Sequence, residues 1–121
     1  MNNKQEAKFS TKFRLWAKKN MPMCVIELKH TRGKDKFTCS ELKEHQYWSL
    51  LAANTSSLAY KIPDDGMGSK PFDMIILKKI VALVVIKYPK GTAAISIKNW
   101  NIEWKTLTFE QAVFIGFEIN I

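Results

Sequence analysis

The sequence predicts an α+β domain in which a mixed sheet is flanked by helices. Three observations lead to this class: an amphipathic helix opens the chain, short strands rich in Ile and Val follow, and helices separate some of these strands. The expected order α-β-α-β-β-β-β-α is typical of a mixed-sheet domain. With 121 residues and an apolar fraction of 46%, the chain is long enough for one packed core, so residues 1–121 are expected to form a single domain.

The first expected element is an amphipathic helix over residues 4–19. Phe9, Phe13 and Trp16 fall at i, i+4 and i+7, and Glu6 lies on the same stripe. Lysines occupy most of the remaining surface of this helix. The apolar stripe is therefore expected to pack on the sheet.

The remaining elements follow from strand composition, turn residues and helix caps. Thr38 and Glu41 have the spacing of a capping box, and Thr108 is a suitable N-cap. Gly and Pro mark the connections between elements. The expected elements after the first helix are a strand over 23–30, a charged loop over 31–36, a helix from about 39 to 53, strands over 58–62, 72–77, 83–88 and 93–97, a loop over 63–70, and a helix over 108–117.

The charge of the chain favours a polyanionic partner. It has 19 basic and 11 acidic residues and a net charge of +8, and nucleic acid is the simplest partner for such an excess. A basic protein without such a partner remains an alternative. Cys24 and Cys39 form neither a disulfide frame nor a zinc motif, which favours a reducing cytoplasm. No signal peptide or membrane-spanning run is recognised, so no membrane partner is expected.

A possible catalytic pair lies in the first strand, Val25-Ile26-Glu27-Leu28-Lys29. Side chains two residues apart on a strand share a face, so Glu27 and Lys29 are expected side by side. A carboxylate beside an ammonium group can hold a divalent metal, a water and a phosphate together, as a metal-dependent nuclease requires. An edge strand with a solvated Glu–Lys pair is the alternative.

A second acidic residue precedes another apolar strand. In Lys70-Pro71-Phe72-Asp73, the carboxylate comes just before the run Met74 to Leu77. A carboxylate at the start of a buried strand lies at the rim of a sheet, where a metal can reach it. Asp after Pro is also a common turn residue, so a purely structural role for Asp73 is the alternative.

Together these segments resemble the PD-(D/E)XK nuclease superfamily, and within it Holliday junction resolvases of archaeal and phage type. Glu27-Leu28-Lys29 resembles the E-x-K motif, and Pro71-Phe72-Asp73 resembles the Pro-Asp element with one residue inserted. The helix that contains Gln46 resembles the helix that follows the E-x-K strand in resolvases and carries a Gln. Glu6 resembles the acidic residue that these enzymes have on their first helix. The resemblance implies a restriction-endonuclease-like sheet.

The resemblance also implies an activity and a set of residues. The activity is cleavage of four-way (Holliday) DNA junctions by a homodimer that uses Mg²⁺ or Mn²⁺, in recombination or repair. The implied metal ligands are Glu6, Glu27 and Asp73, and Lys29 and Gln46 complete the catalytic set. Position and charge, independently of the resemblance, give the DNA-binding candidates: Lys29, His30, Arg32, Lys34 and Lys36 lie on or directly after this strand, where a basic loop can follow a DNA backbone. A solvated surface loop is the alternative.

One departure from the family pattern leaves two readings open. The superfamily places its acidic strand before the E-x-K strand, whereas Asp73 follows Glu27. Either a permuted hairpin brings Asp73 into the sheet next to Glu27, or the native motif is Asp73 with Val85-Ile86-Lys87, in which Val85 has replaced the acid. A nuclease with another DNA substrate and a catalytically silent nucleic-acid-binding protein of the same fold also remain alternatives.

Overall fold

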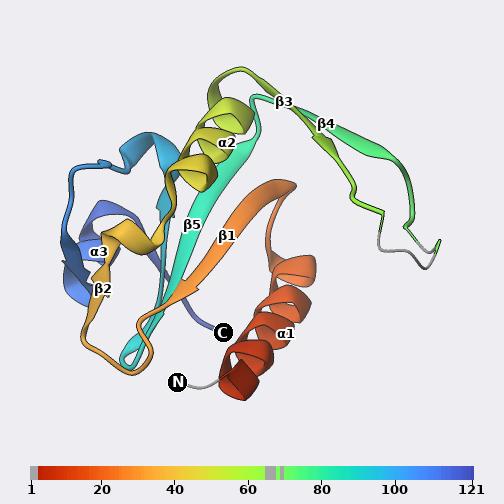
Figure 1. The fold of residues 1–121 in the computed structure, drawn as a ribbon. Coiled ribbons are helices and arrows are strands. Elements are labelled where there is room, and N and C mark those ends of the chain that lie inside the picture. The colour runs from red at the N-terminus through yellow and green to blue at the C-terminus, as the bar shows by residue number, and fades with distance from the viewer. Residues whose placement is uncertain (1–2, 65–67, 69) are drawn as a thin grey trace.

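A computed structural model describes residues 3–64, 68 and 70–121, and Figure 1 shows its ribbon. The expected loop over 63–70 therefore lies partly outside the described residues. Within these residues the structure has three α-helices and eight strands. The helices are α1 (Asn3–Asn20), α2 (Glu44–Thr55) and α3 (Phe109–Ile115), and the strands are β1 (Cys24–His30), β2 (Lys36–Thr38), β3 (Ser57–Lys61), β4 (Met74–Lys78), β5 (Val81–Tyr88), β6 (Gly91–Ser96), β7 (Thr106–Thr108) and β8 (Phe117–Ile119).

The central sheet has four strands in the order β1-β5-β6-β8. Strand β1 pairs in parallel with β5, while β6 is antiparallel to both β5 and β8. The parallel pair is connected through α2, as a crossover between parallel strands requires. This mixed sheet with flanking helices confirms the predicted α+β class.

Two apolar cores cover the two faces of the sheet. On one face α1 contributes Phe13, which packs with Leu83, Val85 and Ile119. On the other face α2 and α3 pack over Val84, Ile86 and their neighbours. The predicted stripe of α1 is confirmed, because Phe9 and Trp16 also pack in the α1 core. Strand alternation therefore sends every second side chain of β1 towards α1 and the others towards α2.

Strands β3 and β4 form a separate two-stranded sheet. This hairpin begins at the end of α2, and its two strands extend away from the central sheet (Figure 1). The reading in which the hairpin that carries Asp73 lies in the same sheet next to Glu27 is therefore wrong for the single chain. Strand β1 pairs only with β5 among the described residues, so its other edge has no strand beside it.

The second helix begins later than the capping-box spacing predicts. Cys39–Glu41 forms one turn of 3-10 helix, and α2 starts at Glu44. The side-chain oxygen of Gln46 accepts the backbone N–H of Lys43 at 2.9 Å, so the side-chain cap of α2 lies one turn further along. By contrast, the predicted cap at Thr108 is confirmed, because its hydroxyl accepts the N–H of Gln111 at 3.1 Å.

The described part of the chain contains no helix that is both long enough and apolar enough to cross a membrane.

Candidate active site

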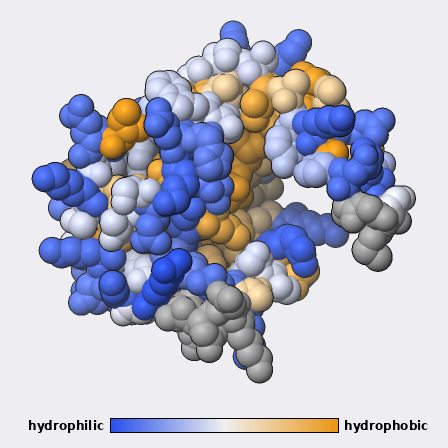
Figure 2. Space-filling view, viewed as in Figure 1, coloured by the Kyte–Doolittle hydropathy of each residue, from blue (hydrophilic) through white to orange (hydrophobic). Residues whose placement is uncertain are grey.

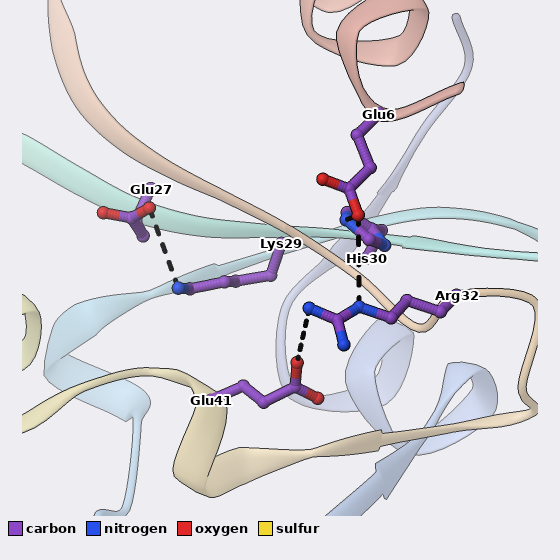
Figure 3. Close-up of polar contacts among 6 residues, drawn as sticks. All are labelled: Glu6, Glu27, Lys29, His30, Arg32 and Glu41. Atoms are coloured by element: carbon purple, nitrogen blue, oxygen red, sulfur yellow. Dashed lines mark ion pairs between the residues drawn. The ribbon is translucent and has the colours of Figure 1, made fainter. Parts of the chain in front are cut away.

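Glu27 and Lys29 lie side by side on β1, as the E-x-K spacing predicts (Figure 3). The Lys29 Nζ is 3.9 Å from the Glu27 Oε2, and the two side chains are 18% and 31% exposed, respectively. Val25, on the same face of the strand, packs into the core below α2. The pair is therefore partly buried on the α2 face and open to solvent at the free edge of β1.

Lys29 lines a cleft of about 260 Å³ at the C-terminal end of β1. Most of the charged groups around this cleft are cationic, which favours an anionic occupant. Among the described residues, Glu41 is the one acidic side chain in the lining. The lining residues are Leu28, Lys29, His30, Arg32, Glu41 and Lys43.

A second polar cluster lies on the α1 face of β1. The Nε2 of His30 is 2.8 Å from the Oε1 of Glu6, which is the distance of a hydrogen bond between an imidazole and a carboxylate. Glu6 comes from the first turns of α1, so this contact ties α1 to the end of β1 (Figure 3). Among the described residues, the buried Nδ1 of His30 has no hydrogen-bond partner, and neither has the buried Thr31 hydroxyl.

Arg32 connects the two faces around the free edge of β1. Its Nε is 4.0 Å from Glu6, and a terminal guanidinium nitrogen is 4.0 Å from Glu41. Figure 3 shows the Arg32 side chain extending between these two carboxylates. Because Arg32 is 63% exposed, these long ion pairs hold it weakly, and it remains available to a phosphate.

The predicted metal ligands do not converge within one chain. Glu6 contacts His30 on the α1 face, whereas Glu27 lies on the α2 face with Lys29. Over the part of the chain that the structure describes, no three His, Cys, Asp or Glu side chains form a group that could hold a metal. A shared metal site for these carboxylates was predicted only from the family resemblance. Strand alternation does not predict where a distant helix or hairpin lies.

Asp73 lies on the projecting hairpin. Its carboxylate is 87% exposed and 3.2 Å from the Lys70 Nζ, which also contacts Asp64 at 3.0 Å. The backbone carbonyl of Asp73 accepts the N–H of Ile62, so the ladder between β3 and β4 extends to this residue. Asp73 therefore directly precedes a strand, as predicted, but that strand is half exposed and belongs to the hairpin, so the prediction of a buried strand at the rim of the main sheet is wrong.

Gln46 has a structural role that its predicted catalytic role did not include. Its side-chain oxygen caps α2 through the backbone N–H of Lys43. Lys43 itself lines the cleft beside Lys29. Gln46 thus positions a cationic residue of the cleft through the start of its helix.

The basic segment after β1 is a tight turn. Arg32 and Gly33 both have positive φ angles, of 58° and 83°, and the N–H of Lys34 donates to the carbonyl of Thr31 at 3.2 Å. Lys34 is exposed, while Lys36 begins β2 opposite Thr108. The turn keeps Arg32 near the cleft and carries Lys36 towards α3.

The alternative motif Val85-Ile86-Lys87 lies beneath α1. Val85 is fully buried in the core between the sheet and α1, which explains an apolar residue at this position without a lost acid. Lys87 pairs with His30 in the strand register and lines a pocket with Lys12 and Lys90. The structure does not bring Asp73 to this segment, because β4 pairs only with β3 among the described residues.

Two charged residues of the cleft were not predicted from the sequence: Glu41 and Lys43. Both lie in the short segment between β2 and α2, which was expected to be the first turns of the helix. The only signal in the sequence is that Gln46 follows Lys43 by three residues, the spacing of a capping side chain.

Neither cysteine is suited to nucleophilic chemistry. Burial raises the pKa of the Cys39 thiol to about 11 and also raises the pKa of Cys24. Both thiols are therefore protonated at neutral pH.

No protein-family model matches the chain, and neither a curated protein nor a solved structure matches it. The resemblance to PD-(D/E)XK nucleases accordingly stays a prediction.

Proposed function

We propose that this protein is a metal-dependent endodeoxyribonuclease that acts on branched DNA. The observation that supports this proposal most directly is the Glu27–Lys29 pair on a strand edge, next to a cleft lined mainly by cations. A carboxylate at this place can take part in binding a hard cation, and an ammonium group within 4 Å of it can bind a phosphate oxygen. The net charge of +8 supports a polyanionic substrate.

The donor set fits Mg²⁺ in part. Mg²⁺ commonly takes one or two protein carboxylates and completes its octahedron with waters and substrate phosphates. Glu27 offers one partly exposed carboxylate, and the predicted second ligand, Asp73, lies on the hairpin. When bound, the ion would stabilise charge on the phosphate and lower the pKa of a coordinated water.

The side chains around the cleft have separate tasks in this proposal. Lys29 would hold an oxygen of the scissile phosphate as a point charge. Arg32 and Lys43, which both line the cleft, would bind the neighbouring phosphates. His30 is held by Glu6, so it would position the end of β1.

The family resemblance is the basis for three further parts of this proposal. They are a preference for four-way junctions, a homodimer, and a role in DNA recombination or repair. Two symmetric cuts across a junction require two active sites, and a twofold dimer supplies them.

The experiment that tests this function uses labelled four-way junction, linear duplex and single-stranded DNA, each with Mg²⁺, Mn²⁺ or EDTA. We expect cleavage of the junction with either metal and none with EDTA. Glu27→Gln removes the ligand charge and should abolish cleavage while DNA binding persists. A wild-type protein that cuts none of these substrates with either metal would contradict the proposal.

A second candidate is a nucleic-acid-binding protein without catalysis. It is favoured by one observation: among the described residues, no three potential ligands converge in the single chain. In that case junction or duplex binding would be identical in EDTA and Mg²⁺, and Glu27→Gln would change neither affinity nor the DNA.

A further inference from the structure

The free edge of β1 borders a groove that the single chain leaves open. A groove of about 500 Å³ lies between α1 and β1 and is lined mainly by apolar side chains. Figure 2 shows apolar surface running down the middle of the molecule, next to the hollow between the hairpin and the rest of the chain. The apolar lining includes Phe13, Met21, Met23, Cys24, Ile26 and Leu28.

The projecting hairpin presents apolar side chains to solvent. Met74 and Ile76 on β4 are 51% and 56% exposed, and Tyr60 and Phe72 are exposed to a similar extent. The segment from Ser57 to Lys79 has four lysines against three aspartates, so it carries little of the positive charge of the chain. An arm that is apolar and nearly neutral suits a protein surface better than DNA.

We propose that the hairpin of one copy docks along the free edge of β1 in a second copy, and that the exchange is reciprocal. Each chain has both the open edge and the apolar arm, so one twofold dimer satisfies both surfaces in both chains. One charge contact is also complementary: Arg14 and Lys18 lie on the α1 wall of the groove, and Asp64 on the hairpin is 80% exposed.

The docked hairpin would also place a side chain at the active site, because side chains alternate along a strand. If Met74 and Ile76 fill the apolar groove on the α1 face, then Asp73 and Ile75 point to the opposite face. That face of β1 carries Glu27 and Lys29. A docked hairpin would therefore bring a second carboxylate to the pair from the partner copy, and this step rests on the proposed nuclease function.

The hairpin is not free to make the same contact within its own chain. Only Lys79 and Ile80 connect β4 to β5, and both are fixed to the end of α2: the Lys79 N–H donates to Ser56 and the Ile80 N–H donates to Ala53. To pair with β1, which already pairs with β5, β4 would have to move two strand spacings from β5, about 9.5 Å. The two-residue link between β4 and β5 spans about 10–11 Å only when it is fully extended. Lys79 is not extended, because its φ is 48°.

The interface is tested first without DNA. We expect the protein to sediment as a dimer, Ile76→Asp to sediment as a monomer, and Phe114→Asp, which changes a 91% exposed side chain on α3, to remain a dimer. Circular dichroism and thermal melting check that each variant is folded. In an Ile76→Cys variant, oxidation should join the new thiol to Cys24 of the other copy, and Cys24→Ser should abolish this crosslink. A wild-type monomer at all concentrations, or a crosslink that does not depend on Cys24, would overturn the proposal.

The contribution of Asp73 is tested by mixing two inactive variants, Glu27→Gln and Asp73→Asn. If the sites form between copies, each mixed dimer has one intact site, so an equal mixture should recover roughly a quarter of the wild-type cleavage rate, because random exchange makes about half of the dimers mixed. A mixture that stays inactive while the wild type cuts would overturn the shared site and leave the nuclease function in place. A dimer with the Cys24 crosslink but no DNA cleavage would overturn the nuclease function and leave the docking in place.

Discussion

At the scale of single residues, the face of β1 decides which side chains can cooperate. Glu27 and Lys29 point to one side of the strand, and His30 points to the other, where Glu6 holds it. The E-x-K spacing was sufficient to predict the first pair because alternation along a strand is local. It could not predict the second contact, because the position of α1 depends on packing with the whole sheet.

Lys29→Ala should lower the cleavage rate by about 10²–10³-fold, because it removes a charge placed to stabilise the phosphate in the transition state. Affinity for the junction should fall only modestly. Single-turnover cleavage and equilibrium binding separate the two effects. Lys87→Ala is the matched control, since Lys87 lies in the neighbouring strand and lines a pocket next to α1. If Lys87→Ala abolishes cleavage and Lys29→Ala does not, the catalytic face has been misassigned.

Gln46→Ala should destabilise the protein by about 0.5–1 kcal/mol, because the first turn of α2 loses its side-chain acceptor. Gln46→Glu keeps an acceptor oxygen and should retain nearly the wild-type stability. Urea unfolding of the two variants makes the comparison. A large loss of cleavage in Gln46→Glu, with unchanged stability, would instead assign Gln46 to the catalytic set.

At the scale of elements, segments with a strong periodic pattern were predictable, whereas the three-residue strands and the start of α2 were not. Helix α1 and strand β1 follow the expected ranges within one or two residues, because periodicity is strong over these lengths. Strands β2, β7 and β8 were missed: each has three residues and is stabilised by distant partners, such as β2 by β7. The position of the hairpin could not be predicted from its local sequence either. It depends on hydrogen bonds that anchor the two residues between β4 and β5 to the end of α2.

The junction between α3 and β8 depends on the absence of a side chain at Gly116. A Cβ built at this position would overlap the carbonyl oxygen of Ala94 on β6, which is backbone and cannot move aside easily. Gly116→Ala should therefore destabilise the protein by about 1–3 kcal/mol or more, as expected for overpacking. Thermal or urea unfolding measures the loss. Gly33→Ala is a useful contrast: nothing lies near its Cβ position, so only the strain of a positive φ would be felt.

At the scale of the whole molecule, charge is unevenly distributed over the elements. Lysines are concentrated on α1 and around the turn that follows β1, while the hairpin is nearly neutral. The same chain thus offers basic surface for a polyanion and apolar surface for a protein. These two kinds of surface lie on different elements, so their contributions can be measured separately.

Neutralising Arg32, Lys34 and Lys36 together with Gln should weaken DNA binding roughly equally for all sequences. It should also reduce the slope of log affinity against log salt by about two to three units, near one per lost phosphate contact. The fold should be little affected, because all three side chains are exposed. The matched variant neutralises Lys78, Lys79 and Lys98. A reduced slope in the matched variant alone would mean that the DNA path avoids the turn after β1.

The packing of α1 also bears on how the chain folds. Phe13 of α1 shares its core with Ile119 of β8, although almost the whole sequence separates them. Contacts between such distant residues are slow to form, because the loop between them must close before they gain any stabilisation. The helix can be formed early by its own hydrogen bonds, yet it reaches its final place only when β8 has joined β6. We therefore expect docking of α1 to be a late folding event, so that loss of the Phe13 side chain accelerates unfolding more than it slows refolding.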